Sequence, residues 1–318
     1  MKVDIIIPTI RDVNFLSDWA QAGEFDRGIK PHIIICEDHF KKEIKFQNPG
    51  LDVSHYTLED VKKDLGKDSW IIPPQTGAIR SFGILKSEAD VIISLDDDCY
   101  PNTPNFIKSH LLKLEDPSFF DFANTYRIIP RGVPYSFRRA HPTMISHGLW
   151  VENPDLDSFT ELGIMAYSGE CARVIGQSFC YDYQIPEGLP YSMCGMNLAF
   201  RKEIKPAMFF QGVLPRYDDI FAGLFSKKVC DAFSWGVKTG YPLVRHSKKS
   251  SIYSNSAKET KGFILNEVWH KALSNSRIVF DGESVIDIYK KIIGYLPDYD
   301  NNGKKIKEAM RKWIGQFQ

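Results

Sequence analysis

The sequence predicts an α/β fold whose sheet is mostly parallel. Apolar, β-branched runs of strand length alternate with segments of helical periodicity through about the first 118 residues. The run Val91–Leu95 has the length and composition of a fully buried strand, and it ends abruptly on Asp96, Asp97 and Asp98. Strands covered on both faces belong to parallel strand–helix–strand units, so these runs favour a parallel arrangement.

The expected elements follow in order along the chain. We expect strands at 3–7, 32–36, 70–72 and 91–95, and helices at 58–65, 77–87 and 105–114. From about 118 to 190, aromatic residues, prolines and glycines are dense and periodicity is poor, which favours irregular and antiparallel structure. Beyond this segment we expect strands at 193–200 and 236–244 and helices at 219–229, 284–295 and 304–317.

Composition excludes several classes of protein. The 318 residues suffice for one large domain or two small ones, and 43% apolar with 25% charged residues is ordinary for a globular protein. Forty basic and forty acidic residues leave no basic excess for nucleic acid. No apolar run approaches the roughly 18 residues of a membrane span. The run at 5–7 is too short for a signal peptide. Six irregularly spaced cysteines predict neither zinc nor disulfides and fit a reducing cytoplasm.

The three acids after the 91–95 run predict a cation site. Adjacent carboxylates repel one another, and a hard divalent cation with oxygen ligands is the usual reason to gather them. Ligands of open α/β sheets also collect at the carboxyl ends of strands. The alternative is a solvated acidic turn or a helix N-cap.

Two further clusters contain side chains suited to a nucleotide. Asp38 follows the second expected strand, and a carboxylate there suits a ribose or a base. Arg11 and Arg80 suit a planar or phosphate partner. A surface ion pair would require the same residue types.

Acids and bases recur in the second half of the chain. Asp218 and Asp219 precede an apolar helix beside Arg216, where they can cap the helix, hold sugar hydroxyls or act as a base. His246 can bind a metal already held by carboxylates, and Lys248 can reach a phosphate. A structural role for the histidine remains open.

Small and aromatic residues in two segments suit a sugar pocket. The first segment, 142–150, contains His147 and Trp150, and the second, 192–200, contains Asn197. Trp150 is equally suited to the core.

These motifs, in this order, resemble the reversibly glycosylated polypeptides, which are the UDP-arabinopyranose mutases of plants and their microbial relatives. The matching segments are VDIIIPTIRD at 3–12, LDDDC at 95–99, PYSFR at 134–138, SHGLW at 146–150, MCGMNLAF at 193–200, RYDD at 216–219, GVKTG at 236–240 and HSK at 246–248. The resemblance covers about residues 3 to 270 and leaves the C-terminal helices unmatched.

The resemblance implies a glycosyltransferase A-type fold, with a Rossmann-like sheet covered by helices on both faces. We expect a catalytic domain at 1–270, with a nucleotide-binding half at 1–118 and a sugar-binding half at 119–270, and a C-terminal helical extension at 271–318. The implied reaction interconverts UDP-arabinopyranose and UDP-arabinofuranose with Mn²⁺ or Mg²⁺. A glycosyltransferase with a separate acceptor is the alternative, and a non-catalytic sugar-nucleotide-binding scaffold is a third reading. A homo-oligomer is expected.

Residue roles follow from the match. The metal would be held by Asp96, Asp97, Asp98 and His246, and the uridine and phosphates by Pro8, Thr9, Arg11, Asp38 and Arg80. The sugar-nucleotide would also contact His147, Trp150, Asn197, Arg216 and Lys248, with Asp218 and Asp219 as catalytic residues. Arg138 would face the anomeric carbon, either as the glycosylated residue or as a phosphate-binding cation. Arg139 and Ala140 depart from the plant pattern of an acid and a glycine, which bears on self-glycosylation and on the sugar used.

Overall fold

The computed structural model describes residues 1–12, 16–23, 28–45, 50–120, 129, 131–172, 182–248, 250–274 and 281–318. Its strands are β1 Val3–Thr9, β2 His32–Glu37, β3 Asp52–Thr57, β4 Val91–Leu95, β5 Cys99–Pro101, β6 Thr143–Glu152, β7 Tyr183–Gln184, β8 Asn197–Arg201 and β9 Gly236–His246. Its α-helices are α1 Leu16–Gln21, α2 Leu58–Leu65, α3 Arg80–Lys86, α4 Phe106–Glu115, α5 Ser158–Ser168, α6 Asp218–Ala232, α7 Ile252–Glu259, α8 Phe263–Leu273, α9 Val285–Tyr295 and α10 Asn301–Ile314.

One mixed sheet organises the described residues. Its strand order is β3-β2-β1-β4-β8-β6-β9-β5, and β7 pairs with β9. The strands β3, β2, β1 and β4 are parallel, whereas β8 runs antiparallel between β4 and β6. Because β6 and β9 are again parallel, the sheet joins two parallel parts through one reversed strand. The expected strand–helix alternation is thus confirmed in the first half.

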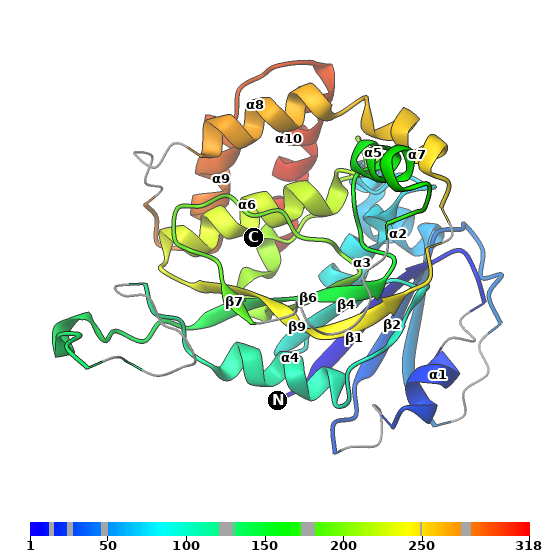
Figure 1. The fold of residues 1–318 in the computed structure, drawn as a ribbon. Coiled ribbons are helices and arrows are strands. Elements are labelled where there is room, and N and C mark those ends of the chain that lie inside the picture. The colour runs from blue at the N-terminus through cyan, green and yellow to red at the C-terminus, as the bar shows by residue number, and fades with distance from the viewer. Residues whose placement is uncertain are drawn as a thin grey trace.

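Helices cover both faces of this sheet (Figure 1). Along β1, side chains alternate between the faces, so Ile6 belongs to one buried cluster and Ile5 and Ile7 to the other. The Ile6 face packs against α2, α3 and α6, and the opposite face packs against α1 and α4. The expected class, a Rossmann-like sheet with helices on both faces and a helical C-terminus, is confirmed.

The C-terminal helices pack into the core of the sheet domain. Trp313 of α10 is fully buried, stacks on Phe209 at 5.2 Å between ring centroids, and donates a hydrogen bond from Nε1 to the carbonyl oxygen of Pro206 at 2.9 Å. Tyr289 of α9 packs edge-on against Phe225 of α6. The domain boundary expected at 270 lies inside α8, and helices on either side of it share one hydrophobic cluster.

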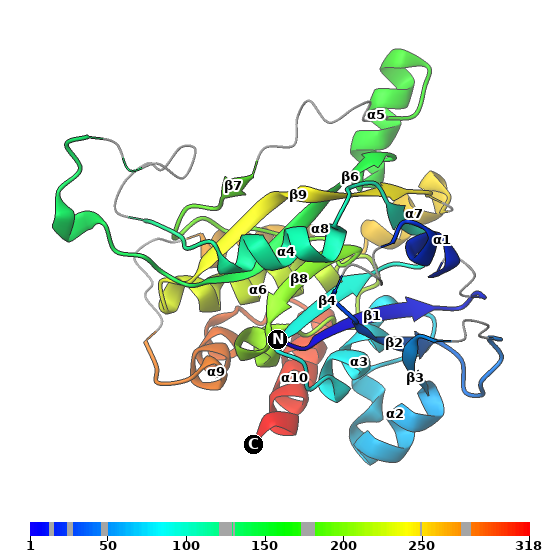
Figure 2. The same cartoon turned by 90° about the horizontal axis from the view of Figure 1, so that it is seen from below.

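Several sequence expectations differ from the observed elements. Residues 70–72, expected as a strand, lie at the end of a 3₁₀-helix, η1 Gly66–Ile71. The expectation was wrong because an apolar run this short carries no reliable period. Strand β3 was missed, since it is a partly exposed edge strand rich in polar residues. Helix α5 was missed because it is apolar on most sides. Figure 2 shows it standing away from the sheet.

Among the described residues, no helix combines the length and the hydropathy that crossing a bilayer requires.

The packing of α10 gives a first prediction. Trp313→Ala removes a fully buried ring and leaves a cavity, so we expect the free energy of unfolding to fall by about 3 to 5 kcal/mol. The measurement is urea unfolding followed by circular dichroism. Glu308→Ala, on the exposed face of the same helix, should change the value by less than about 0.5 kcal/mol. If both variants lowered the free energy of unfolding by the same small amount, the packing of α10 would not stabilise the sheet domain.

Candidate active site

The acids after β4 meet the end of β1 because these strands are parallel neighbours. Thr9 is the last residue of β1, and its Oγ1 donates to Oδ2 of Asp97 at 2.7 Å. Arg11 donates from Nη1 to Oδ1 of the same carboxylate at 2.8 Å. With 41% of its side chain exposed, Arg11 remains accessible to a ligand. The structure thus brings these three predicted residues together.

Asp98 and His246 meet through the pairing of β5 with β9. The antiparallel register places Cys99 opposite His246, and Nε2 of His246 lies 3.8 Å from Oδ1 of Asp98. The other ring nitrogen, Nδ1, is 2.9 Å from the carbonyl oxygen of Asn153. A carbonyl oxygen only accepts, so Nδ1 donates to it, and Nε2 is the ring nitrogen that faces Asp98.

This pair has the features of a partial cation site. The 3.8 Å separation falls within the span of two metal–ligand bonds of about 2.1 Å each. A histidine held through its other nitrogen by a backbone carbonyl is the usual arrangement for a metal ligand. No group of three such donors converges within the part of the chain that the structure describes. The remaining ligands would therefore come from substrate phosphates and water, as Mg²⁺ and similar cations prefer.

Asp96 is engaged by a buried cation instead. Nη2 of Arg80 donates to Oδ1 of Asp96 at 2.6 Å, while Nη1 donates to Oγ of Ser94 at 2.7 Å and to the carbonyl oxygen of Gly195 at 2.6 Å. The Arg80 side chain is only 7% exposed. It therefore acts here as a counter-ion for the acids, which differs from the phosphate-binding role expected from sequence.

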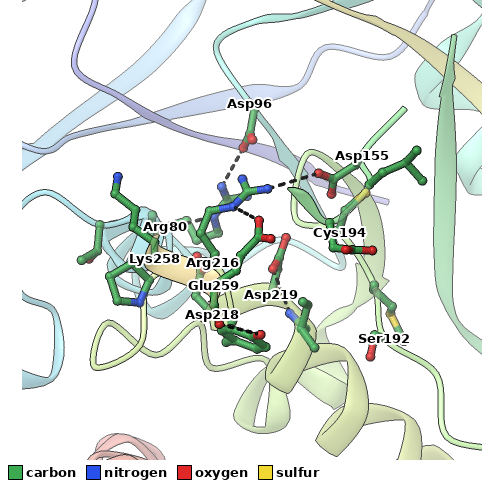
Figure 3. A pocket seen from close by; sticks show the side chains of 18 of the residues that line it. Arg80, Asp96, Asp155, Ser192, Cys194, Arg216, Asp218, Asp219, Lys258 and Glu259 are labelled. Carbon is green, nitrogen blue, oxygen red and sulfur yellow. Dashed lines mark hydrogen bonds and ion pairs between the residues drawn. The ribbon is translucent and has the colours of Figure 1, made fainter. Parts of the chain in front are cut away.

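A cavity of about 530 Å³ opens beside these residues. Figure 3 shows its charged wall, where Asp155, Asp219 and Glu259 lie around Arg216 and Asp218 lies near Arg80. Less polar side chains complete the lining: Leu149, Trp150, Leu156, Tyr191, Met193, Cys194 and Ile220. A volume of this size, with an apolar wall and a few convergent polar groups, suits one small ligand.

Burial raises the pKa values of two cavity acids and of Asp98 outside the cavity. Burial, followed by the charge of Asp219, raises the pKa of Asp218 to about 7. The same two causes raise the pKa of Asp155 to about 6. Burial also raises the pKa of Asp98 to about 6, with the neighbouring Asp96 adding to the effect. Carboxyl groups with pKa values near neutrality can accept and release protons under physiological conditions.

The two predicted cations Arg216 and Lys248 each pair with an acid. Arg216 donates from Nε to Glu259 of α7 at 3.2 Å and lies 3.9 Å from Asp155. Lys248 forms an ion pair with Glu161 of α5. Arg216 lines the cavity, whereas Lys248 does not.

His147 and Trp150 line the cavity as expected. His147 is buried, with Nδ1 2.8 Å from the Tyr191 hydroxyl and Nε2 3.1 Å from Sγ of Cys194. Burial, and then the charge of Lys113, lowers the pKa of His147 to about 3. The imidazole is therefore neutral and contributes shape and hydrogen bonding rather than charge.

Asn197 lies in the core rather than at the cavity. Its Oδ1 lies 2.9 Å from Nε2 of His110, and its Nδ2 donates to the carbonyl oxygens of Leu149 at 2.8 Å and Pro242 at 2.9 Å. These bonds connect β8 to β6 and β9. The structure thus gives Asn197 a structural role in place of the sugar contact expected from sequence.

Asp38 retains one free oxygen. Its Oδ2 accepts from the backbone N–H of Thr76 at 3.0 Å, but the buried Oδ1 has no hydrogen-bond partner among the described residues. Burial raises the pKa of Asp38 to about 6. An unsatisfied buried oxygen one residue beyond β2 is suited to accept a hydrogen bond from a ribose or a base.

Arg138 does not face the cavity of its own chain. It follows a short 3₁₀-helix, η3 Tyr135–Phe137, and its guanidinium donates to the carbonyl oxygen of Val133 and stacks over the Tyr135 ring at 4.2 Å. Figures 1 and 2 both place this segment at the opposite end of the molecule from α7, which contributes Lys258 and Glu259 to the cavity. In this arrangement Arg138 cannot contact a sugar bound in the cavity, which corrects the position expected from the family match.

Asp155, Tyr191 and Glu259 are among the cavity residues that the sequence analysis did not predict. Asp155 directly follows a proline three residues beyond β6, in the segment where periodicity was too poor to place elements. Its position after a strand was the one available signal.

The raised pKa of Asp218 gives a prediction for stability. In the unfolded chain its pKa returns to about 3.9, so the folded state holds the proton over the window from about pH 4 to 7 and loses stability as the pH rises through it. Asp218→Asn should therefore melt a few degrees above the wild type at pH 8, with a smaller difference at pH 5. Differential scanning calorimetry at both pH values measures this.

Asp90→Asn provides the matched control. Hydrogen bonds from the Lys2 backbone and from Lys202 lower the pKa of this exposed acid, so its charge stabilises the fold at pH 8. Its replacement should lower the melting temperature there. An Asp218→Asn variant that is also less stable at pH 8 would contradict a destabilising charge at that site.

Comparison with known proteins agrees with the sequence match. The profile of the family "Reversibly glycosylated polypeptide" matches residues 1–318. A Pisum sativum protein named "Probable UDP-arabinopyranose mutase 1" is 34% identical, over 98% of this chain and 89% of its own length. The Arabidopsis thaliana "UDP-arabinopyranose mutase 2" is 33% identical over 98% of this chain and 90% of its own.

Among solved structures, S. aureus TarS with UDP-GlcNAc covers 100% of this chain and 89% of its own, at 10% identity and a TM-score of 0.47. At this TM-score the likeness supports no conclusion about the present chain. The family match extends over the whole sequence, and the relatives are about one-third identical over nearly all of it. The chain belongs to the reversibly glycosylated polypeptide family.

Proposed function

We propose that this protein is a metal-dependent UDP-arabinopyranose mutase, which interconverts UDP-arabinopyranose and UDP-arabinofuranose. The mutase names of relatives that match it end to end support this reaction. The observation that carries the proposal is the Asp98–His246 pair, which lies at the strand ends beside a cavity lined by carboxylates with raised pKa values.

The nucleotide end of the substrate would lie over β1 and β2. Oδ1 of Asp38 would accept a hydrogen bond from the ribose or the base, with Pro8 and Thr9 forming the adjacent surface. Arg11, half-exposed beside Asp97, would donate to the diphosphate. A cation held by Asp98 and His246 would neutralise charge on the diphosphate and so make UDP a better leaving group.

The sugar would occupy the cavity. Tyr191, His147 and Trp150 offer an uncharged wall, while Arg216, Asp218 and Asp219 offer hydrogen bonds to hydroxyl groups. Asp219 is itself held by the backbone N–H groups of Gly195 at 3.0 Å and Ile220 at 2.8 Å, so its position is fixed before substrate arrives. Self-glycosylation of Arg138 stays outside this proposal because the residue lies away from the cavity.

The first test is a product assay. Purified protein incubated with UDP-arabinopyranose and Mn²⁺, without any acceptor, should yield UDP-arabinofuranose, resolved by chromatography of the nucleotide sugars. Removing the metal with a chelator should stop the formation of UDP-arabinofuranose. Unchanged substrate, combined with UDP release once a sugar acceptor is added, would replace the mutase with a glycosyltransferase.

The cation site gives a second test. Asp98→Asn removes a ligand charge while keeping the shape, so we expect conversion and Mn²⁺ affinity in the presence of UDP to fall by at least about 100-fold. Isothermal titration measures the affinity, and the product assay measures turnover. Asp90→Asn, an identical change on the surface, serves as the control. Metal affinity equal to that of the wild type would remove Asp98 from the site.

A further inference from the structure

Asp155 occupies the loop between β6 and α5 and faces the cavity (Figure 3). The loop is fixed at both ends. At its start, Asn153 accepts from Nδ1 of His246 at 2.9 Å and donates from Nδ2 to the carbonyl oxygen of the same residue at 2.7 Å. At its end, Ser158 donates from its backbone N–H and its hydroxyl to Glu259, at 2.8 and 2.6 Å. Asp155 is therefore held in a defined place relative to the cation site.

Most other acids of the cavity are already engaged. Asp96 pairs with Arg80, Asp219 accepts from Gly195 and Ile220, Asp157 caps α5, and Glu259 accepts from Ser158 and Arg216. Asp218 lies against Gly77 and the guanidinium of Arg80. For Asp155, the contact given by the described residues is the 3.9 Å approach of Arg216, which is longer than a hydrogen bond. Its carboxylate thus remains available to a ligand.

The charges around Asp155 are balanced. Arg216 and His246 favour its ionised form, and Asp219 and Asp96 disfavour it. Together with burial, which is the largest influence, they place its pKa at about 6. A group of this kind can both take up and return a proton within one catalytic cycle.

We propose that Asp155 is the residue that moves the proton during ring contraction of the sugar. This inference rests on the proposed mutase reaction and names a catalytic group within it. When the bond between the anomeric carbon and UDP breaks, its electron pair leaves with UDP. The hydroxyl that becomes the furanose ring oxygen then bonds to the anomeric carbon and gives its proton to the Asp155 carboxylate.

The second half of the step returns the proton. The bond between the anomeric carbon and the old ring oxygen breaks, its electron pair stays on that oxygen, and Asp155 protonates it. A phosphate oxygen of UDP then bonds to the anomeric carbon. Asp155 ends in its starting state, and no other reactant is consumed.

The test separates bond cleavage from ring contraction. UDP-arabinopyranose labelled with heavy oxygen at the glycosidic position reports reversible cleavage, because the label moves to a non-bridging phosphate position. Asp155→Asn should keep this label exchange within a few-fold of the wild type, bind UDP equally, and form UDP-arabinofuranose at least about 100-fold more slowly. Asp90→Asn should match the wild type in all three measurements.

Each other outcome decides against the inference. Unimpaired furanose formation in Asp155→Asn would show that no proton passes through this residue. Loss of exchange together with conversion, with UDP binding intact, would assign Asp155 to cleavage of the UDP bond. A wild type that exchanges label but forms no furanose would reject the mutase proposal itself, and the inference with it.

A second variant at the same position is used if Asp155→Asn does not fold correctly. If Asp155→Asn fails to bind UDP, Asp155→Ala is assayed with added formate, which can replace a missing carboxylate. Formate-dependent recovery of conversion supports the proton-transfer role, since a purely structural residue would not respond to it. Failure of formate to restore conversion in a folded variant overturns it.

Discussion

A buried guanidinium holds the charged end of this molecule together. Arg80 donates to Asp96, to Ser94 and to the carbonyl of Gly195, so one side chain joins the end of β4 to the loop before β8. Its charge also faces the two acids at the start of α6. Removing the guanidinium would leave several buried carboxylates without a counter-ion, which is far more costly than losing a surface ion pair. The burial of these acids therefore depends on Arg80.

The sequence predicted elements best where local pattern and burial coincide. Strand β4 and helix α2 occur at the expected bounds because one is buried and mostly apolar and the other is amphipathic. Strand β3 could not be found this way, since its pairing with β2 rather than its composition makes it a strand. Helix α5 is apolar without a hydrophilic face to mark its period. For β3, tertiary pairing overrides propensity.

The candidate site divides along the same line. The proximity of Asp98 and His246 could be predicted, because acids after a buried strand and a histidine near a strand end are typical metal ligands. The roles of Arg80 and Asn197 could not, since each depends on partners supplied by distant strands. Asp155 was missed for the same reason. Its position depends on the two hydrogen bonds that join the nearby Asn153 to His246 of the distant strand β9.

The register between β5 and β9 has a consequence for how the protein matures. Asp98 and His246 are distant in sequence, and β8 and β6 lie in the sheet between β4 and β9. Such pairings between distant segments are slow to form, because the chain entropy of loop closure is lost before the contacts stabilise the fold. The proposed cation would therefore find no assembled binding pair on a half-folded chain.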